Sequence, residues 1–151
     1  MLFRSGEAAA IFKELADAEI NIDMIVQNIS TGGTGRTDVS FTLPATDGPT
    51  ALAALRKIQD RVGFSDLLYD DHVGKLSLIG AGMRSHPGVS ARFFAALADA
   101  GINVEMISTS EIRISVVCRD TDVDLAVRAV HDAFDLGSAD TEAVVYGGTG
   151  R

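Results

Sequence analysis

The sequence predicts an α+β fold built from two similar domains in tandem, each with two helices on one face of an antiparallel sheet. Two observations carry this prediction. Residues 6–25 align with residues 88–107 without a gap and are identical at 11 of 20 positions. Within both copies, stretches with apolar residues at helical spacing alternate with stretches of strand-like alternation. Such self-similarity at a fixed offset indicates a tandem duplication, so we expect two small domains rather than one.

Each copy opens with a predicted helix followed by a short strand. The helical positions are Ala8, Ile11, Phe12 and Leu15 in the first copy and Phe93, Phe94, Leu97 and Ala98 in the second. The strands are expected at IDMIVQN (22–28) and VEMIS (104–108). Alternating apolar residues then predict strands at DVSFTLP (38–44) and EIRISVVC (111–118).

A second helix and a closing strand complete each copy. Pro49 stands near the start of the helix expected up to Val62, and Gly137 follows the helix expected from Val123 to Phe134. Closing strands are expected at DLLYD (66–70) and EAVVY (142–146).

An opening strand, KLSLIG (75–80), precedes the first helix of the second copy. The second copy therefore has the order β-α-β-β-α-β, which is the ferredoxin-like order. Only MLFRS (1–5) precedes the helix of the first copy, so its opening strand is expected to be very short or missing. We place the two domains at residues 1–72 and 73–151.

Composition limits the possible partners and compartments. The net charge is −8, and the Lys and Arg residues are scattered, which argues against nucleic acid or an anionic membrane as a partner. No apolar run approaches the roughly 20 residues of a membrane span, and the first residues have no stretch of signal-peptide length. Cys118 is the single cysteine and cannot form an internal disulfide, so we expect a cytoplasmic protein.

No pattern of catalytic or cofactor-binding residues emerges. After Gly80 and Gly82, the third glycine of a dinucleotide-binding turn is replaced by Ser85, and no P-loop motif occurs. The three histidines and Cys118 lack metal-ligand spacing. We therefore predict no catalytic residue, no cofactor and no metal.

The turn at Pro87-Gly88 can be interpreted in two ways. The first N–H groups of the helix that follows lack internal partners, and together with the helix dipole they suit a carboxylate. Alternatively, Pro-Gly only shapes the turn. Asp70-Asp71 is best interpreted as a solvated acidic turn, and Cys118 as part of the core.

Three stretches together resemble the C-terminal regulatory region of aspartokinases. They are KLSLIGAGMRSHPGV (75–89), INVEMISTSEIRISVV (102–117) and LLYDDHVGK (67–75). That region of the family carries two ACT domains, which have the ferredoxin-like order, and the resemblance extends over residues 6–151. It implies a regulatory (beta) chain that is not itself an enzyme, because the Lys-Phe-Gly-Gly-Thr stretch of the kinase domain is absent. The implied partners are a second copy, which pairs through the ACT domains, and the catalytic (alpha) chain.

The resemblance also implies two types of effector site at ACT–ACT interfaces, for L-threonine and/or L-lysine. The threonine-type site would use Gly6, Ala8, Gln27, Asn103 and Val104. The lysine-type site would use Asn21, Ile22, Asp23, Met83, His86, Gly88, Val89, Ser110 and Glu111. In each set, the asparagine-containing connection of one copy would complete the effector site at the turn and helix start of the other copy. One position departs from the family, which has an Asp three residues before Gly6 where this chain has Phe3.

Two other functions compatible with the fold are a ligand-free assembly module and an acylphosphatase-like enzyme. The first predicts dimerisation without any response to amino acids. The second needs an arginine in the turn before the helix, where Arg84 is the candidate.

Overall fold

The computed structural model describes residues 5–29, 37–80, 87–135 and 143–148. The chain divides into two compact units, which are described separately below. Unit 1 comprises Met1–Asp71 with Gly150–Arg151, and unit 2 comprises His72–Thr149. The exact domain bounds at residues 72 and 73 stay a prediction.

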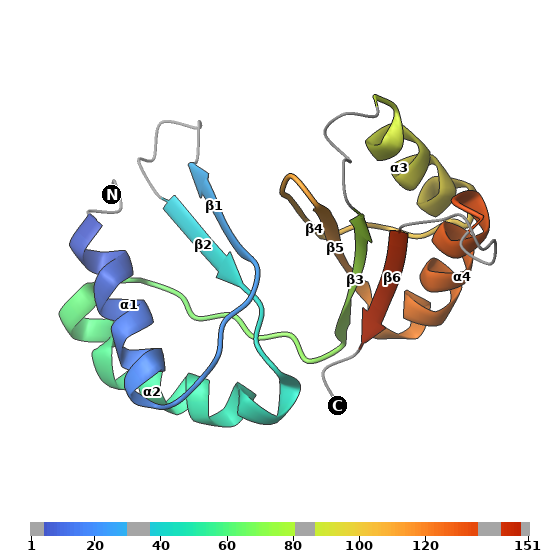
Figure 1. The fold of residues 1–151 in the computed structure, drawn as a ribbon. Coiled ribbons are helices and arrows are strands. Elements are labelled where there is room, and N and C mark those ends of the chain that lie inside the picture. Colours follow the sequence, from blue (N-terminus) through green and yellow to red (C-terminus); the bar gives the residue numbers. More distant parts are fainter. Residues whose placement is uncertain (1–4, 30–36, 81–86, 136–142, 149–151) are drawn as a thin grey trace. The chain divides into compact units, whose positions relative to one another are not determined.

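Unit 2 has the predicted β-α-β-β-α-β order. Its elements are β3 (Val73–Gly80), α3 (Val89–Asp99), β4 (Met106–Thr109), β5 (Arg113–Arg119), a 3-10 turn η3 (Asp120–Asp122), α4 (Val123–Ala133) and β6 (Ala143–Gly148). The strand order in the sheet is β4-β5-β3-β6, and every neighbouring pair is antiparallel. Helices α3 and α4 lie on one face of this sheet (Figure 1). The ferredoxin-like fold is therefore confirmed in unit 2.

The core of unit 2 lies between this sheet and its two helices. Alternate residues of the central strands point into it, so that Leu76 pairs with Val116 and Leu78 with Ile114 in register. The buried members are Leu76, Leu78, Phe93, Leu97, Ile102, Ile114, Val116, Cys118, Val123, Ala126 and Val130. Cys118 thus lies in the core as predicted, whereas Ala98 is exposed and Ile112 lies just before β5 with 56% of its surface exposed.

Unit 1 repeats part of this arrangement. Its elements are α1 (Ser5–Asp17), β1 (Ile25–Ile29), β2 (Thr37–Phe41), η1 (Ala45–Asp47) and α2 (Gly48–Val62). The strands form a two-stranded antiparallel sheet that lies over α1 and α2 (Figure 1). The buried core residues are Ile11, Leu15, Ile20, Ala51, Leu55 and Ile58.

The prediction of a closing strand at residues 66–70 is wrong. The segment belongs to no strand, and Leu68 is 92% exposed. Its counterpart β6 is held in the sheet by pairing with the opening strand β3. In unit 1 the first described element is α1, and no described strand occupies the position of β3. A closing strand without that partner has no ladder to join.

The second helices of the two copies, α2 and α4, begin alike, as the duplication predicts. Pro49 lies in the first turn of α2, and η1 and η3 precede α2 and α4 at equivalent positions 75 residues apart. Helix α4 ends at Ala133, and Gly137, the expected stop, lies outside the described residues. Equivalent residues of the two copies therefore differ by 82 in number up to β1 and β4, and by 75 from β2 and β5 onward.

Candidate functional site

The connections from the first helix to the next strand are nearly identical in the two units. Asn21, Ile22 and Asp23 occupy this connection in unit 1, and Asn103, Val104 and Glu105 occupy it in unit 2. Both asparagines are exposed, whereas Ile22 and Val104 are partly buried against their respective cores. Packing of the apolar residue therefore fixes the connection and leaves the asparagine amide available to a ligand.

Backbone hydrogen bonds fix these connections further. The Asp23 N–H donates to the Thr42 carbonyl at 3.0 Å, and the Glu105 N–H donates to the Val117 carbonyl at 2.8 Å. Thr42 and Val117 are equivalent, so the repeat reproduces the bond as well as the residues. In both copies the backbone next to the asparagine is held by the neighbouring strand.

The carboxylates next to these asparagines have different surroundings. Glu105 accepts a hydrogen bond from the Arg119 guanidinium at 2.7 Å. The residue equivalent to Arg119 in unit 1 is Pro44, which cannot form this ion pair. The carboxylate of Asp23 therefore differs from that of Glu105 in its neighbours, although the two are equivalent in sequence.

The helix starts also differ between the copies. Gly88 precedes α3 with φ of 95°, a left-handed conformation that favours glycine, and Val89 is the first helical residue. Its equivalent, Gly6, lies inside the first turn of α1, as does Ala8. At both starts the first backbone N–H groups lack helical partners and can bind a carboxylate.

Ser110 and Glu111 form the turn between β4 and β5, and both are exposed. The Ser110 N–H donates to the Arg113 carbonyl at 2.7 Å, which closes this turn. Gln27 is exposed on β1, where it is paired with Val39 of β2.

The structure thus places the predicted site residues in two groups, one in each unit. Gly6, Ala8, Asn21, Ile22, Asp23 and Gln27 belong to unit 1, and Gly88, Val89, Asn103, Val104, Ser110 and Glu111 belong to unit 2. Met83 and His86 lie outside the described residues, as do Phe3 and Arg84. The pairing of one copy's turn with the other copy's asparagine stays a prediction.

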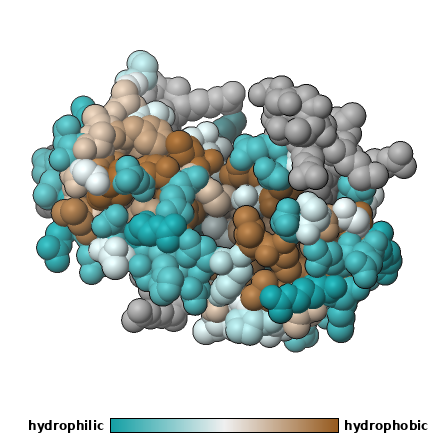
Figure 2. All heavy atoms as spheres, turned by 180° about the vertical axis from the view of Figure 1, so that it is seen from behind, coloured by the Kyte–Doolittle hydropathy of each residue, from teal (hydrophilic) through white to brown (hydrophobic). Residues whose placement is uncertain are grey.

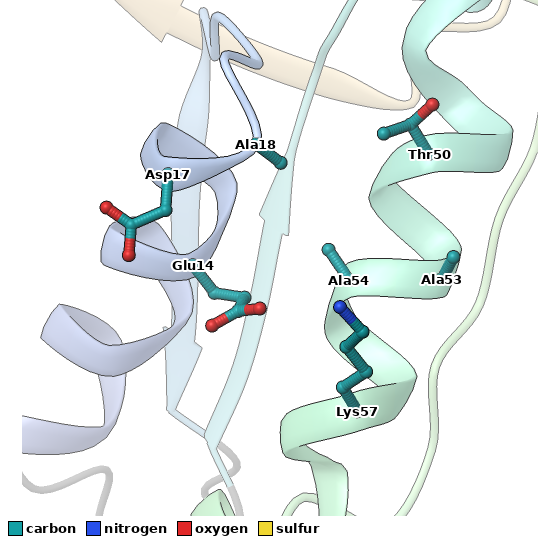
Figure 3. Close-up of a pocket in the computed structure, with 7 residues that line it drawn as sticks. All are labelled: Glu14, Asp17, Ala18, Thr50, Ala53, Ala54 and Lys57. Atoms are coloured by element: carbon teal, nitrogen blue, oxygen red, sulfur yellow. The ribbon is translucent and has the colours of Figure 1, made fainter.

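A shallow groove between α1 and α2 was not expected from the sequence. Its volume is about 270 Å³, and it is lined by Glu14, Asp17, Ala18, Thr50, Ala53, Ala54 and Lys57. Glu14 and Lys57 lie between the helices, whereas Asp17 points away from the groove (Figure 3) and pairs with Lys13. None of these residues belongs to the predicted effector sites, and three of the seven are alanines.

Among the described residues of unit 2, Cys118 and Lys75 have shifted pKa values. Burial raises the pKa of the Cys118 thiol, and the nearby Asp122 and Glu105 raise it further. Burial lowers the pKa of Lys75, and the positive charge of Arg113 lowers it further. The Cys118 thiol therefore stays protonated and poorly nucleophilic near neutral pH.

Within the described ranges, no three His, Cys, Asp or Glu side chains are grouped to hold a metal. In the same ranges, no helix is long and apolar enough to cross a membrane.

Comparison with known proteins assigns the family. The sequence model of the ACT domain matches residues 1–59 and 76–134, so that one match falls in each unit. The chain belongs to the ACT domain family. The two matches confirm the tandem ACT arrangement predicted from the repeat and the resemblance.

The relatives of this ACT pair are aspartokinases. The chain is 60% identical over 146 residues to an aspartokinase of Mycobacterium tuberculosis, and 57% identical over 148 residues to one of Corynebacterium glutamicum. These alignments cover 97% and 98% of this chain but only 34% and 35% of the relatives. The chain thus spans about a third of the length of the curated relatives.

Two solved structures of aspartokinase subunits match this chain over most of their own length. A structure of aspartokinase alpha and beta subunits has a TM-score of 0.79 at 45% identity, covering 87% of this chain and 85% of the other. The ligand-free regulatory subunit of aspartate kinase from Thermus thermophilus has a TM-score of 0.77 at 40% identity, with the same coverage. This ACT pair is therefore of the type found in aspartokinase regulatory subunits.

Proposed function

We propose that this ACT pair is the regulatory part of an aspartokinase and binds L-threonine and/or L-lysine to inhibit the kinase. The observation that carries the proposal is the duplicated connection with its exposed asparagine, Asn21 in one unit and Asn103 in the other. The 40% identity to the regulatory subunit from Thermus thermophilus supports the same role. The kinase that is regulated would be a separate catalytic chain or domain.

The chemistry of the predicted residues suits a free amino acid. Its carboxylate needs N–H donors, which the helix starts at Gly6 and Gly88 offer. Its ammonium needs acceptors, which the asparagine side chains, the backbone carbonyls and Asp23 offer. Two further residues would select the side chain, because Gln27 can bond the hydroxyl of threonine and Glu111 can pair with the ε-ammonium of lysine.

Inhibition requires only a modest coupling between sites. Allosteric coupling is worth about 1–3 kcal/mol in typical cases, which one or two ligand contacts made in a single state can supply. Because each proposed site combines residues of two ACT domains, the effector would bind more tightly to the state in which these domains are paired. The paired state includes the homodimer that we expect to form through the ACT domains.

Calorimetric titration of the purified chain with L-threonine and with L-lysine tests the proposal. We expect saturable binding of at least one of them. Affinity for L-threonine should fall at least tenfold in Asn103→Ala, and affinity for L-lysine should fall at least tenfold in Asn21→Ala. Asn28→Ala is the matched control, because Asn28 is an exposed asparagine of β1 outside both predicted sets. The control should bind as the wild type does.

Other results would contradict the proposal. Equal loss in Asn28→Ala and Asn103→Ala would mean that the effect is not specific to the connection. If neither amino acid binds while the chain still forms a dimer in sedimentation, the chain is an assembly module without an effector.

A further inference from the structure

The groove between α1 and α2 is a feature of unit 1 that the predicted effector sites do not use. Glu14 on α1 and Lys57 on α2 lie on opposite sides of it, and three alanines line it between them, Ala18, Ala53 and Ala54 (Figure 3). An alanine side chain ends at Cβ, so the space between the two helices is open to a larger side chain from outside.

Helix α4 of unit 2 has larger residues at the positions equivalent to those with which α2 lines the groove. It carries Leu125, Arg128 and Asp132 in place of a threonine, an alanine and a lysine. Leu125 is 49% exposed, and the side chains of Arg128 and Asp132 are also exposed. The duplicated helix therefore lines an open groove in unit 1 and presents long side chains in unit 2.

The spacing of these residues on α4 matches the length of the groove. Leu125 and Asp132 are seven residues apart on α4, and Thr50 and Lys57 are seven residues apart on α2. Seven residues of helix rise by about 10.5 Å, so the two spans are equal. Arg128 lies on the same face of α4, because its spacing from Leu125 is three residues. When this face lies along the groove with Asp132 beside Lys57, Leu125 reaches the end that Thr50 lines.

The charges on the two surfaces are opposite. Glu14 and Lys57 border the groove, and Arg128 and Asp132 follow Leu125 on α4. Within the part of the chain that the structure describes, none of these four charged side chains forms an ion pair. Arg128 can thus meet Glu14, and Asp132 can meet Lys57, without the loss of an existing pair. Charge pairs of this kind select the partner and its orientation more than they add affinity.

Exposed apolar surface alone would not identify this contact. On the face of the molecule that Figure 2 shows, hydrophobic and hydrophilic areas lie beside one another. Ile25 and Ile107, for example, are as exposed as Leu125. Leu125 differs from them because the residues one and two turns further along its helix carry charges opposite to those beside the groove.

We propose that α4 of a second molecule of this chain lies along the groove between α1 and α2. Its Leu125 fills the space above the alanines. Its Arg128 pairs with Glu14 on α1, and its Asp132 pairs with Lys57 on α2. Groove and helix are different surfaces, so the contact is heterologous. It involves none of the predicted effector residues and goes beyond the proposed function, which stands whether or not this contact forms.

Disulfide trapping between two different variants of the whole chain tests the contact. One variant carries Thr50→Cys and the other carries Leu125→Cys, so that a disulfide between the two new cysteines can join only different molecules. Cys118 is buried and does not compete. After the variants are mixed under mild oxidation, we expect a mixed dimer of the calculated mass. It should form at least tenfold faster than with His131→Cys, an exposed residue about 120° around α4 from Leu125.

Charge reversal tests the specificity of the contact. Arg128→Glu in the Leu125→Cys variant should slow trapping at least tenfold, because two acidic side chains then meet. Glu14→Arg in the Thr50→Cys variant should restore most of the rate. Arg56→Glu in the Thr50→Cys variant is the matched control, because Arg56 is exposed on α2 and does not line the groove. This control should leave the rate within twofold.

Three outcomes would overturn the proposal. If no mixed dimer forms at millimolar protein, a second molecule does not occupy the groove. Equal trapping of Leu125→Cys and His131→Cys would mean that α4 does not bind by this face. If Arg128→Glu slows trapping and Glu14→Arg does not restore it, the two charges do not meet. Circular dichroism of each variant checks that it is folded, which we expect because the exchanged side chains lie at the surface.

Discussion

Glu19 has a left-handed backbone conformation that is costly for a residue with a side chain. It has φ of 59° at the end of α1, and its equivalent at the end of α3 is Gly101 with φ of 73°. The two helices end alike. The Ile20 N–H donates to the Leu15 carbonyl after α1, and the Ile102 N–H donates to the Leu97 carbonyl after α3. This motif places a left-handed residue after the helix, which glycine adopts without steric cost.

Glu19→Gly should therefore stabilise unit 1. The left-handed conformation costs a non-glycine residue roughly 1–2 kcal/mol, and the greater chain entropy of glycine offsets part of the gain. We expect the free energy of unfolding to rise by about 0.5–1 kcal/mol in urea denaturation followed by circular dichroism. Gly101→Ala is the matched change in unit 2 and should lower the free energy of unfolding by about 1 kcal/mol. Glu19→Gly variants no more stable than wild type would contradict the strain argument.

Cys118 should make stability depend on pH above neutrality. The folded protein holds the pKa of this thiol above its usual value, mainly by burial, whereas the unfolded chain ionises it near pH 8.5. Above that pH the unfolded state binds fewer protons than the folded one, so stability falls as pH rises toward the folded pKa.

Urea titrations at pH 7.5 and pH 10 measure this effect. The free energy of unfolding should fall more over that interval in the wild type than in Cys118→Ala. The difference between the two falls should be at most about 1.4 kcal/mol per pH unit. Other groups titrate in both proteins, and the comparison cancels them. Equal losses would show that the folded and unfolded thiols ionise alike.

At the scale of elements, the hydrogen bond between Ser77 of β3 and Ser115 of β5 joins the two central strands of unit 2. The hydroxyl oxygens are 2.7 Å apart, and both side chains are buried. Ser115→Ala leaves the Ser77 hydroxyl buried without this partner and should cost about 1–3 kcal/mol of unfolding free energy. Removing both hydroxyls should cost less than the sum of the single changes.

A double-mutant cycle in urea measures that difference. Ser40→Ala is the matched control, because Ser40 is the exposed equivalent of Ser115 and should change the free energy by less than about 0.5 kcal/mol. Strict additivity of Ser77→Ala and Ser115→Ala would mean that the hydroxyls do not act as a pair.

Local pattern was sufficient to predict most elements. Helical spacing identified the buried residues Ile11, Leu15, Phe93 and Leu97, and alternation identified Ile114 and Val116. The prediction failed at residues 66–70, where DLLYD was expected to form the closing strand of the first copy. Strand formation there depends on a neighbour that is distant in sequence, and periodicity within the segment carries no information about that neighbour.

For the whole molecule, the repeat predicted the two-domain fold, whereas the candidate site was predicted only in part. The sequence identified the duplicated Asn21 and Asn103 but did not predict that Gly88 is left-handed while Gly6 is helical. Likewise, Arg119 at the end of β5 pairs with Glu105 just before β4, whereas Pro44 stands at the position equivalent to Arg119 in unit 1. The pattern common to both copies contains neither difference, because it records only what the two copies share.

The two proposed site types should accordingly differ in strength, and Phe3 provides the test. The family pattern has an Asp at this position, where its carboxylate would meet the effector ammonium. A charge-assisted hydrogen bond contributes about 1.5–3 kcal/mol, so Phe3→Asp should tighten L-threonine binding by at least tenfold in calorimetry. Phe3→Asn is the matched control, because it has the shape of Asp without the charge and should gain much less. Equal affinity for L-threonine in wild type and Phe3→Asp would mean that residue 3 does not contact the effector. Loss of L-lysine binding in Asn21→Ala would still support the regulatory role.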